Sequence, residues 1–139
     1  MAHVEVSFRE LTKSFRNLRK HAPDATEGTC CLLDALYAAE CGIAALILRQ
    51  NSYSTTKELV PKTHDIREML KKCAVAPAHN LPSRLSVTPL KNARKNHVLF
   101  ANLHSALRYG ATLYGREWKE CAREVTKLNT WIDNNLKRR

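Results

Sequence analysis

The sequence predicts an all-α protein, a four- or five-helix up-and-down bundle that forms a single domain over residues 1–139. Apolar residues recur at helical spacings of three and four along most of the chain. Strand-like alternation is confined to the short stretch "VEVSF" at residues 4–8, which is expected to be an extended arm. A chain of 139 residues, 44% of them hydrophobic, can enclose one packed core and is too short for two ordinary ones.

The first helix is expected over residues 7–21, and Pro23 ends it. Its apolar residues fall on one stripe with basic residues around it, namely Phe8, Leu11, Phe15 and Leu18. The second helix is expected over residues 26–50, with Asp24 or Thr26 as its N-cap. Because this segment is apolar on nearly all sides, we expect it at the centre of the core.

A third, short helix is expected in "HDIREMLKKC", where Thr63 can supply the N-cap. Asp65 lies in its first turn and two lysines lie in its last turn, and both placements suit the helix dipole. Pro77 and Pro82 then mark a loop that is expected to change the direction of the chain.

Two more helices complete the expected bundle. Thr88 and Pro89 are typical of the N-cap and first position of a fourth helix, which runs to Tyr109 and ends at Gly110. The last helix is expected to start near Arg116. Its buried face is expected to consist of Trp118, Cys121, Val125, Leu128, Trp131, Ile132 and Leu136.

The charge of the chain indicates its partner more than its fold. There are 23 Lys and Arg residues against 13 Asp and Glu, a formal net charge of +10. Such a surface attracts polyanions, and the attraction weakens as salt rises. Nucleic acid is therefore the first partner to consider, and a well-solvated surface that serves only solubility is the alternative.

Several classes of protein are disfavoured by what the sequence contains. No stretch is expected to reach the roughly 20 apolar residues of a bilayer span, and the first ten residues carry charge where a signal peptide needs an apolar run. We therefore expect a soluble, cytoplasmic protein with no membrane partner. Five cysteines, an odd number without a CxxC pair, favour buried reduced thiols over disulfides or a zinc site. No metal or cofactor is expected, and no Walker, dinucleotide-glycine, HExxH or GxSxG motif occurs.

His104 and Arg108 are the first candidate catalytic pair. Four residues apart on a helix, they share one face and can address the same group. An arginine can hold a phosphate in a bidentate grip and a histidine can transfer a proton, so the pair suits phosphodiester chemistry. The alternative is a purely structural link from this pair to Glu40 or Asp65.

The second candidate catalytic pair is Arg16 and His21, with Asn17 directly after the arginine. The alternative is that these residues only form a solvated basic face of the helix. The candidate phosphate-tracking surface consists of Lys91, Arg94, Lys95 and His97, together with Arg108 and Tyr109. Aromatic residues are only 6% of the chain, so base stacking is not expected to be the main mode of binding.

Three polar residues are expected either to support a functional site or to form polar contacts that stabilise the core. Glu40 lies inside an apolar helical segment, where a carboxylate needs a basic partner or a function. His64 and Asp65 open the third helix, where they can either help to hold an anion or cap the helix.

Three segments together resemble the HEPN superfamily of small all-helical nucleotide- and RNA-associated domains. They are "ALYAAECGIAALIL" at residues 35–48, "THDIREML" at residues 63–70 and "LRYG" at residues 107–110. The resemblance implies a helical bundle that forms a homodimer and, in active members, cleaves RNA without a metal in a defence or toxin-antitoxin setting. Active members carry an Arg-x4-6-His motif, which here occurs only at Arg16 to His21 in the first helix; His104 and Arg108 stand in reversed order.

These observations leave three hypotheses. The first is an HEPN-like protein that binds nucleic acid, with RNA favoured, and that can include metal-independent endoribonuclease activity. The second is a non-catalytic module that docks a helical face on an acidic protein partner. The third is a helical pocket that holds a nucleotide through Arg108.

Overall fold

The computed structural model describes residues 6–58, 65–73, 79, 81–88, 96–110, 112–113 and 115–137. Within these ranges the protein is mostly helical, which confirms the predicted all-α class with four to five helices. The helices are α1 (Phe8–His21), α2 (Thr29–Gln50), α3 (Ile66–Lys71), α4 (Leu103–Arg108) and α5 (Gly115–Lys137). A small sheet is made of β1 (Arg84–Thr88), β2 (Asn96–Leu99) and β3 (Thr112–Leu113).

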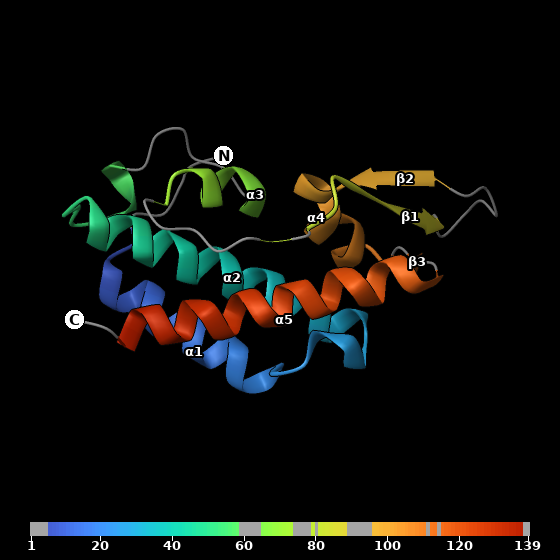
Figure 1. The fold of residues 1–139 in the computed structure, drawn as a ribbon, viewed down its shortest axis with the longest axis horizontal. Helices are drawn as coiled ribbons and strands as arrows, with labels where there is room; N and C mark the ends of the chain where they lie inside the picture. Colours follow the sequence, from blue (N-terminus) through green and yellow to red (C-terminus); the bar gives the residue numbers. More distant parts are fainter. Residues whose placement is uncertain are drawn as a thin grey trace.

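The three long helices form the body of the protein, and α1 and α5 both pack on α2 (Figure 1). They come closest at Gly42 of α2. A Cβ atom added there would lie 2.5 Å from Cγ2 of Ile132 on α5 and 2.8 Å from Cδ1 of Phe15 on α1. Glycine is therefore required for the three helices to approach each other this closely.

Helix α2 is the centre of the core, as its sequence predicts, because it is buried on nearly all sides. The expectation that no stretch of the chain reaches the length of a bilayer span is wrong for this helix. In the described part of the chain, α2 alone is long and apolar enough to span a membrane. The core helix of a soluble protein passes the same test, and 67% of the relevant stretch is buried inside the protein.

The start of α1 follows the prediction closely. Ser7 caps the helix, since its Oγ accepts a hydrogen bond from the Glu10 amide at 3.2 Å and the Glu10 carboxylate accepts one from the Ser7 amide at 3.2 Å. The expected extended arm is confirmed at its described end, where Val6 exchanges hydrogen bonds with Thr56. Asp24 caps the 3-10 turn Ala25–Glu27, and α2 begins at Thr29, three residues later than expected.

The predicted fourth helix is wrong at residue 88 and over residues 96–102, and residues 89–95 lie outside the described part of the chain. Strand β1 pairs antiparallel with β2 on one side and with β3 on the other, and Thr88 pairs with Thr112 instead of capping a helix. A 3-10 turn at Phe100–Asn102 leads into α4, which begins only at Leu103. Strands this short contain too few alternations to stand out in the sequence, and only pairing across the sheet stabilises them.

The remaining helices lie in the predicted segments, but α3 begins at Ile66 and the predicted N-cap Thr63 is wrong. Asp65 caps α3, because its carboxylate accepts a hydrogen bond from the Arg67 amide at 3.0 Å. The expected cap Thr63 and its neighbour His64 lie outside the described residues. Helix α5 begins within one residue of Arg116, and its predicted apolar face is buried except for Trp118 and Trp131, which are half-buried against the core. In Figure 1, α4 and the sheet lie near the N-terminal end of α5.

Candidate nucleic-acid interface

The predicted pair His104 and Arg108 does not form one open site. The half-buried His104 lies edge-on to Tyr37, with ring centroids 6.2 Å apart and planes at 61°, and both rings line a small cavity with Glu40. Arg108 is exposed in the last turn of α4 and is not among the described residues that line this cavity. Helix α4 therefore directs the two side chains to different surroundings.

The cavity beside His104 is too small to hold a nucleotide. Its volume is about 10 Å³, close to the minimum for one water molecule. Its walls bring Glu40 and His104 together, as the structural alternative for this pair predicted, and Tyr37, Leu36, Ile66 and Phe100 also line it. Asp65 does not line it within the described part of the chain. The arrangement suits a polar contact that stabilises the core better than it suits a ligand site.

The second predicted pair, Arg16 and His21, also separates. Both side chains are exposed on α1, but the five-residue step places them about 140° apart around the helix. Arg16 lines two surface grooves, and in the described structure His21 lines neither of them. The histidine and the arginine therefore lie on different sides of α1.

The predicted phosphate-tracking surface is described only in part. Lys91, Arg94 and Lys95 lie outside the described residues. His97 belongs to β2, where it stands opposite Ser86 of β1. Tyr109 is 74% exposed directly after the exposed Arg108, so both are accessible to a partner.

The structure assembles a different cluster of bases on α1. Four exposed bases recur along α1 at spacings of four, three and four residues: Arg9, Lys13, Arg16 and Lys20. At 100° per residue they fall within about 60° of the circumference of the helix, and they extend for about 16 Å along its axis. We call these four residues the α1 basic stripe.

The stripe keeps its charge because the nearby carboxylates are occupied elsewhere. In the described structure none of the four bases has an ion pair. The single carboxylate of α1 belongs to Glu10, which faces its own N-terminal cap. Hydrogen bonds from the Ser7 side chain and backbone hold the pKa of Glu10 below its ordinary value.

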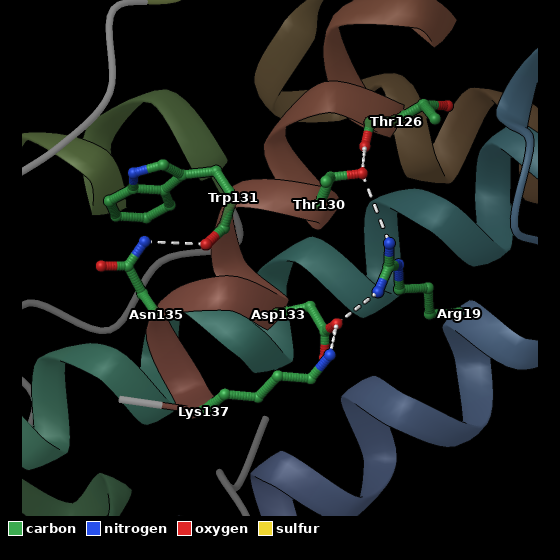
Figure 2. A network of polar contacts seen from close by, with 7 residues as sticks. All are labelled: Arg19, Thr126, Thr130, Trp131, Asp133, Asn135 and Lys137. Atoms are coloured by element: carbon green, nitrogen blue, oxygen red, sulfur yellow. Dashed lines mark hydrogen bonds and ion pairs between the residues drawn. The ribbon is translucent and has the colours of Figure 1, made fainter. Parts of the chain in front are cut away.

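Asp133 of α5 lines the smaller groove beside Arg16 and Lys20, and two other bases already form ion pairs with it. Figure 2 shows Arg19 reaching from α1 to Asp133 at 2.9 Å and to the Thr130 hydroxyl at 3.3 Å, while Lys137 meets the same carboxylate at 3.0 Å. Partial burial alone raises the pKa of Asp133, but the Lys137 hydrogen bond and the charges of Arg19 and Lys137 together lower it. This network leaves the stripe unneutralised.

Two grooves border the stripe, because α1 and α5 both rest on α2 and touch each other at few points. The larger groove has a volume of about 490 Å³. It is lined by Phe8, Arg9, Thr12, Lys13, Arg16, Asn17 and Leu136. The smaller groove, of about 300 Å³, is lined by Arg16, Arg19, Lys20, Pro23 and Asp133. Arg16 is the residue they share.

Three members of the stripe, Arg9, Lys13 and Lys20, were not among the residues that the sequence motifs singled out. Their signal was available in the sequence, because bases separated by four, three and four positions share one helix face. What the sequence could not supply was the position of the carboxylates. Whether such a stripe is neutralised depends on α5, more than a hundred residues away along the chain.

The cysteines and the acidic residues give no sign of a metal centre in the described part of the chain, where no group of three His, Cys, Asp or Glu residues could hold an ion. The prediction of buried thiols is correct for Cys121 and wrong for Cys30, which is exposed. Burial raises the pKa of Cys121 to about 12 and those of Cys41 and Cys73 to about 11, so these thiols are poor nucleophiles at neutral pH.

No protein-family model, curated protein or solved structure matches this chain. The resemblance to the HEPN superfamily therefore stays a prediction from three short segments.

Proposed function

We propose that the protein binds nucleic acid, with RNA favoured, through the α1 basic stripe. One observation carries this proposal: four exposed bases follow one line of a helix, border two grooves and have no ion pair among the described residues. Lysine and arginine side chains that neutralise phosphates release bound counterions, and this release is a major source of affinity. The net charge of +10 adds long-range attraction to the same partner.

The dimensions of the stripe suit a short stretch of a strand. Its length of about 16 Å equals about five phosphate steps along one strand of a duplex. Four neutralised phosphates on a single strand predict a slope near −3 when the logarithm of the association constant is plotted against that of the salt concentration. This slope distinguishes contacts with individual phosphates from a general preference for anions.

We propose binding without cleavage as the principal activity. General acid–base catalysis needs a proton-transferring group within hydrogen-bond reach of the reacting atoms, and the described residues that line the two grooves include no histidine. Metal-independent ribonuclease activity is the subordinate hypothesis. Incubation of the protein with RNA in EDTA tests it: cleavage that is lost in His104→Ala and kept in His21→Ala would assign the activity to His104 and overturn the binding-only proposal.

A pair of quadruple variants with equal net charge tests the interface. The first replaces the stripe: Arg9→Gln, Lys13→Gln, Arg16→Gln and Lys20→Gln. The second replaces four exposed bases of α5: Arg116→Gln, Lys119→Gln, Arg123→Gln and Lys127→Gln. In titrations with a fluorescent single-stranded RNA at about 100 mM salt, we expect the first to lose about 100-fold in affinity and the second about threefold or less.

The outcomes of this comparison are distinct. An equal loss in both variants would mean that net charge alone attracts the RNA, and the assignment to α1 would be wrong. Unchanged binding in the stripe variant would place the interface elsewhere, with Lys91, Arg94 and Lys95 as the next residues to replace. Circular dichroism of both variants checks that the helices remain folded.

A protein partner is the second candidate, because Leu99 and Tyr109 are large apolar residues that are 59% and 74% exposed. A homodimer and an acidic protein are the two partners to distinguish, the first by light scattering and the second by binding that is insensitive to salt. We also propose a cytoplasmic location, since five cysteines without a disulfide in the structure suit a reducing compartment. The defence or toxin-antitoxin role follows from the HEPN resemblance alone.

A further inference from the structure

The larger groove differs from the rest of the α1 surface because it combines an apolar floor with a basic rim. Phe8 and Leu136 supply apolar surface from α1 and α5, and three members of the stripe, Arg9, Lys13 and Arg16, line the same hollow. A surface that only follows phosphates needs neither an aromatic ring nor a recess. The combination is suited to a ligand that has an anionic part and a flat apolar part.

The larger groove has the volume of a small-molecule site, and its charge separates it from its neighbour. A volume of about 490 Å³ falls within the range of about 300 to 1,000 Å³ that is typical of small-molecule sites. The smaller groove contains the carboxylate of Asp133, which already forms ion pairs with Arg19 and Lys137. Among the described side chains that line the larger groove there is no carboxylate.

We propose that the larger groove accommodates one unstacked nucleobase of a single strand whose phosphates lie on the α1 basic stripe. This inference rests on the proposed function and names its substrate class: single-stranded nucleic acid with an accessible base. The base lies against the Phe8 ring, and the phosphates on either side of it meet Arg9, Lys13 and Arg16. One base in one groove is compatible with the low aromatic content of the chain.

Two polar side chains of the groove are placed to contact the edge of such a base. The Thr12 hydroxyl donates to the Phe8 carbonyl at 2.9 Å, so only its oxygen lone pairs are available to a ligand. The exposed Asn17 amide has no partner in the described structure and can both donate and accept. An amide of this kind can form paired hydrogen bonds with a base whose edge is not used in a duplex.

The proposal predicts a preference for single strands over duplexes. Every base in a duplex is stacked and paired, and moving one base into a protein groove requires breaking both interactions. Contacts between phosphates and lysine or arginine by themselves favour the duplex, because its charge density is higher and each contact releases more counterions. A preference for the single strand at an equal number of phosphates therefore comes from the base.

The experiment titrates the full chain with three oligonucleotides that carry the same number of phosphates: a uridine octamer, an octamer of abasic residues and an RNA duplex. We expect the uridine octamer to bind about tenfold more tightly than the other two. A deoxyuridine octamer is the fourth arm, and it shows whether the sugar contributes.

Matched variants test whether the tighter binding of the uridine octamer comes from the larger groove. Asn17→Ala and Phe8→Leu are expected to reduce binding of the uridine octamer severalfold and to leave the abasic octamer unchanged. Ser14→Ala, an exposed α1 residue that is not among the residues lining the larger groove, is the control and is expected to change neither. Asn17 is exposed, so its variant tests the groove without disturbing the core to which Phe8 contributes.

Failure of this inference and failure of the proposed function give different results. If the uridine and abasic octamers bind equally tightly, the base site is wrong and the phosphate interface stands. If no oligonucleotide binds, both proposals are wrong. If the variants weaken the two octamers by the same factor, the groove contacts only the backbone and the base site is again overturned.

Discussion

Helices α1 and α5 rest on the same central helix, yet their exposed faces differ in electrostatic character (Figure 1). Each contains five lysine or arginine residues. Helix α1 contains one carboxylate and α5 contains four. In α5, Lys127 lies 3.6 Å from Glu124 and Lys137 lies 3.0 Å from Asp133, so bases and acids alternate along the helix.

The comparison shows that the number of bases does not locate a binding surface. Ion pairs at the surface, such as that of the exposed Lys127 with the half-buried Glu124, reduce the field that a phosphate would experience. The α1 basic stripe retains its field because its one acid serves as a cap and because Asp133 is occupied by Arg19 and Lys137. Under the proposed function, the arrangement of carboxylates therefore decides which of two helices with the same number of bases attracts a polyanion.

The largest effect is expected on the stability of the fold, at the position where both helices meet the core. Gly42→Ala forces a methyl group against Phe15 of α1 and Ile132 of α5, and we expect the free energy of unfolding to fall by about 2 kcal/mol. Denaturant titration measures the change. Gly28→Ala is the control, because no atom lies within 4 Å of the added Cβ, and it is expected to cost about 1 kcal/mol or less. Equal losses in the two variants would contradict the close approach at Gly42.

A charge reversal on each helix compares the two faces directly. Arg16→Glu is expected to weaken binding of single-stranded RNA by about tenfold, because Arg16 borders both grooves and its neighbours on the stripe are also bases. Arg123→Glu makes the same change of charge on the exposed face of α5 and is expected to weaken binding by about twofold or less. Fluorescence anisotropy at a fixed salt concentration measures both. A larger effect of Arg123→Glu would reverse the comparison.

Removing the carboxylate between the helices is expected to extend the stripe. Asp133→Asn releases Arg19 and Lys137, and we expect RNA affinity to rise about threefold and the salt slope to steepen by about 0.7 to 1.4. The neighbouring exposed residue provides the control: Asn134→Ala removes no ion pair and is expected to change neither quantity. Reduced affinity in Asp133→Asn would mean that this carboxylate orients Arg19 for binding instead of competing with the RNA.

The smallest effect is expected from pH. The pKa of Asp133 is lowered in the folded protein, so its ion pairs stabilise the fold above the ordinary carboxyl pKa and are lost as pH falls through the lowered value. Wild type is therefore expected to lose stability below about pH 4, and Asp133→Asn to lose less over the same interval. Glu10 has a lowered pKa as well, so a residual slope is expected in the variant. Identical slopes would show that Asp133 is not responsible.

The long helices could be predicted from local patterns because their ends and faces depend on neighbouring residues. Ser7 followed by Glu10 is sufficient to predict a capping box, and the apolar spacing of α5 predicts its buried face. The sheet could not be predicted in this way, because Thr88 next to a proline resembles a helix start unless its partner Thr112 is known. The same limit applies to the candidate site, where His104 and Arg108 have the right spacing but face different surroundings.

The sequence by itself determined the all-α class, the central position of α2, the net charge of +10 and the line of bases on α1, since composition and helical periodicity are local properties. Only the tertiary structure decided which of those bases remain unneutralised and where a groove opens. Both depend on contacts between residues far apart in the chain, such as the ion pair of Arg19 with Asp133 and the close approach of Phe15 and Ile132 to Gly42. Packing and ion pairs act across space, and a pattern along the chain does not record them.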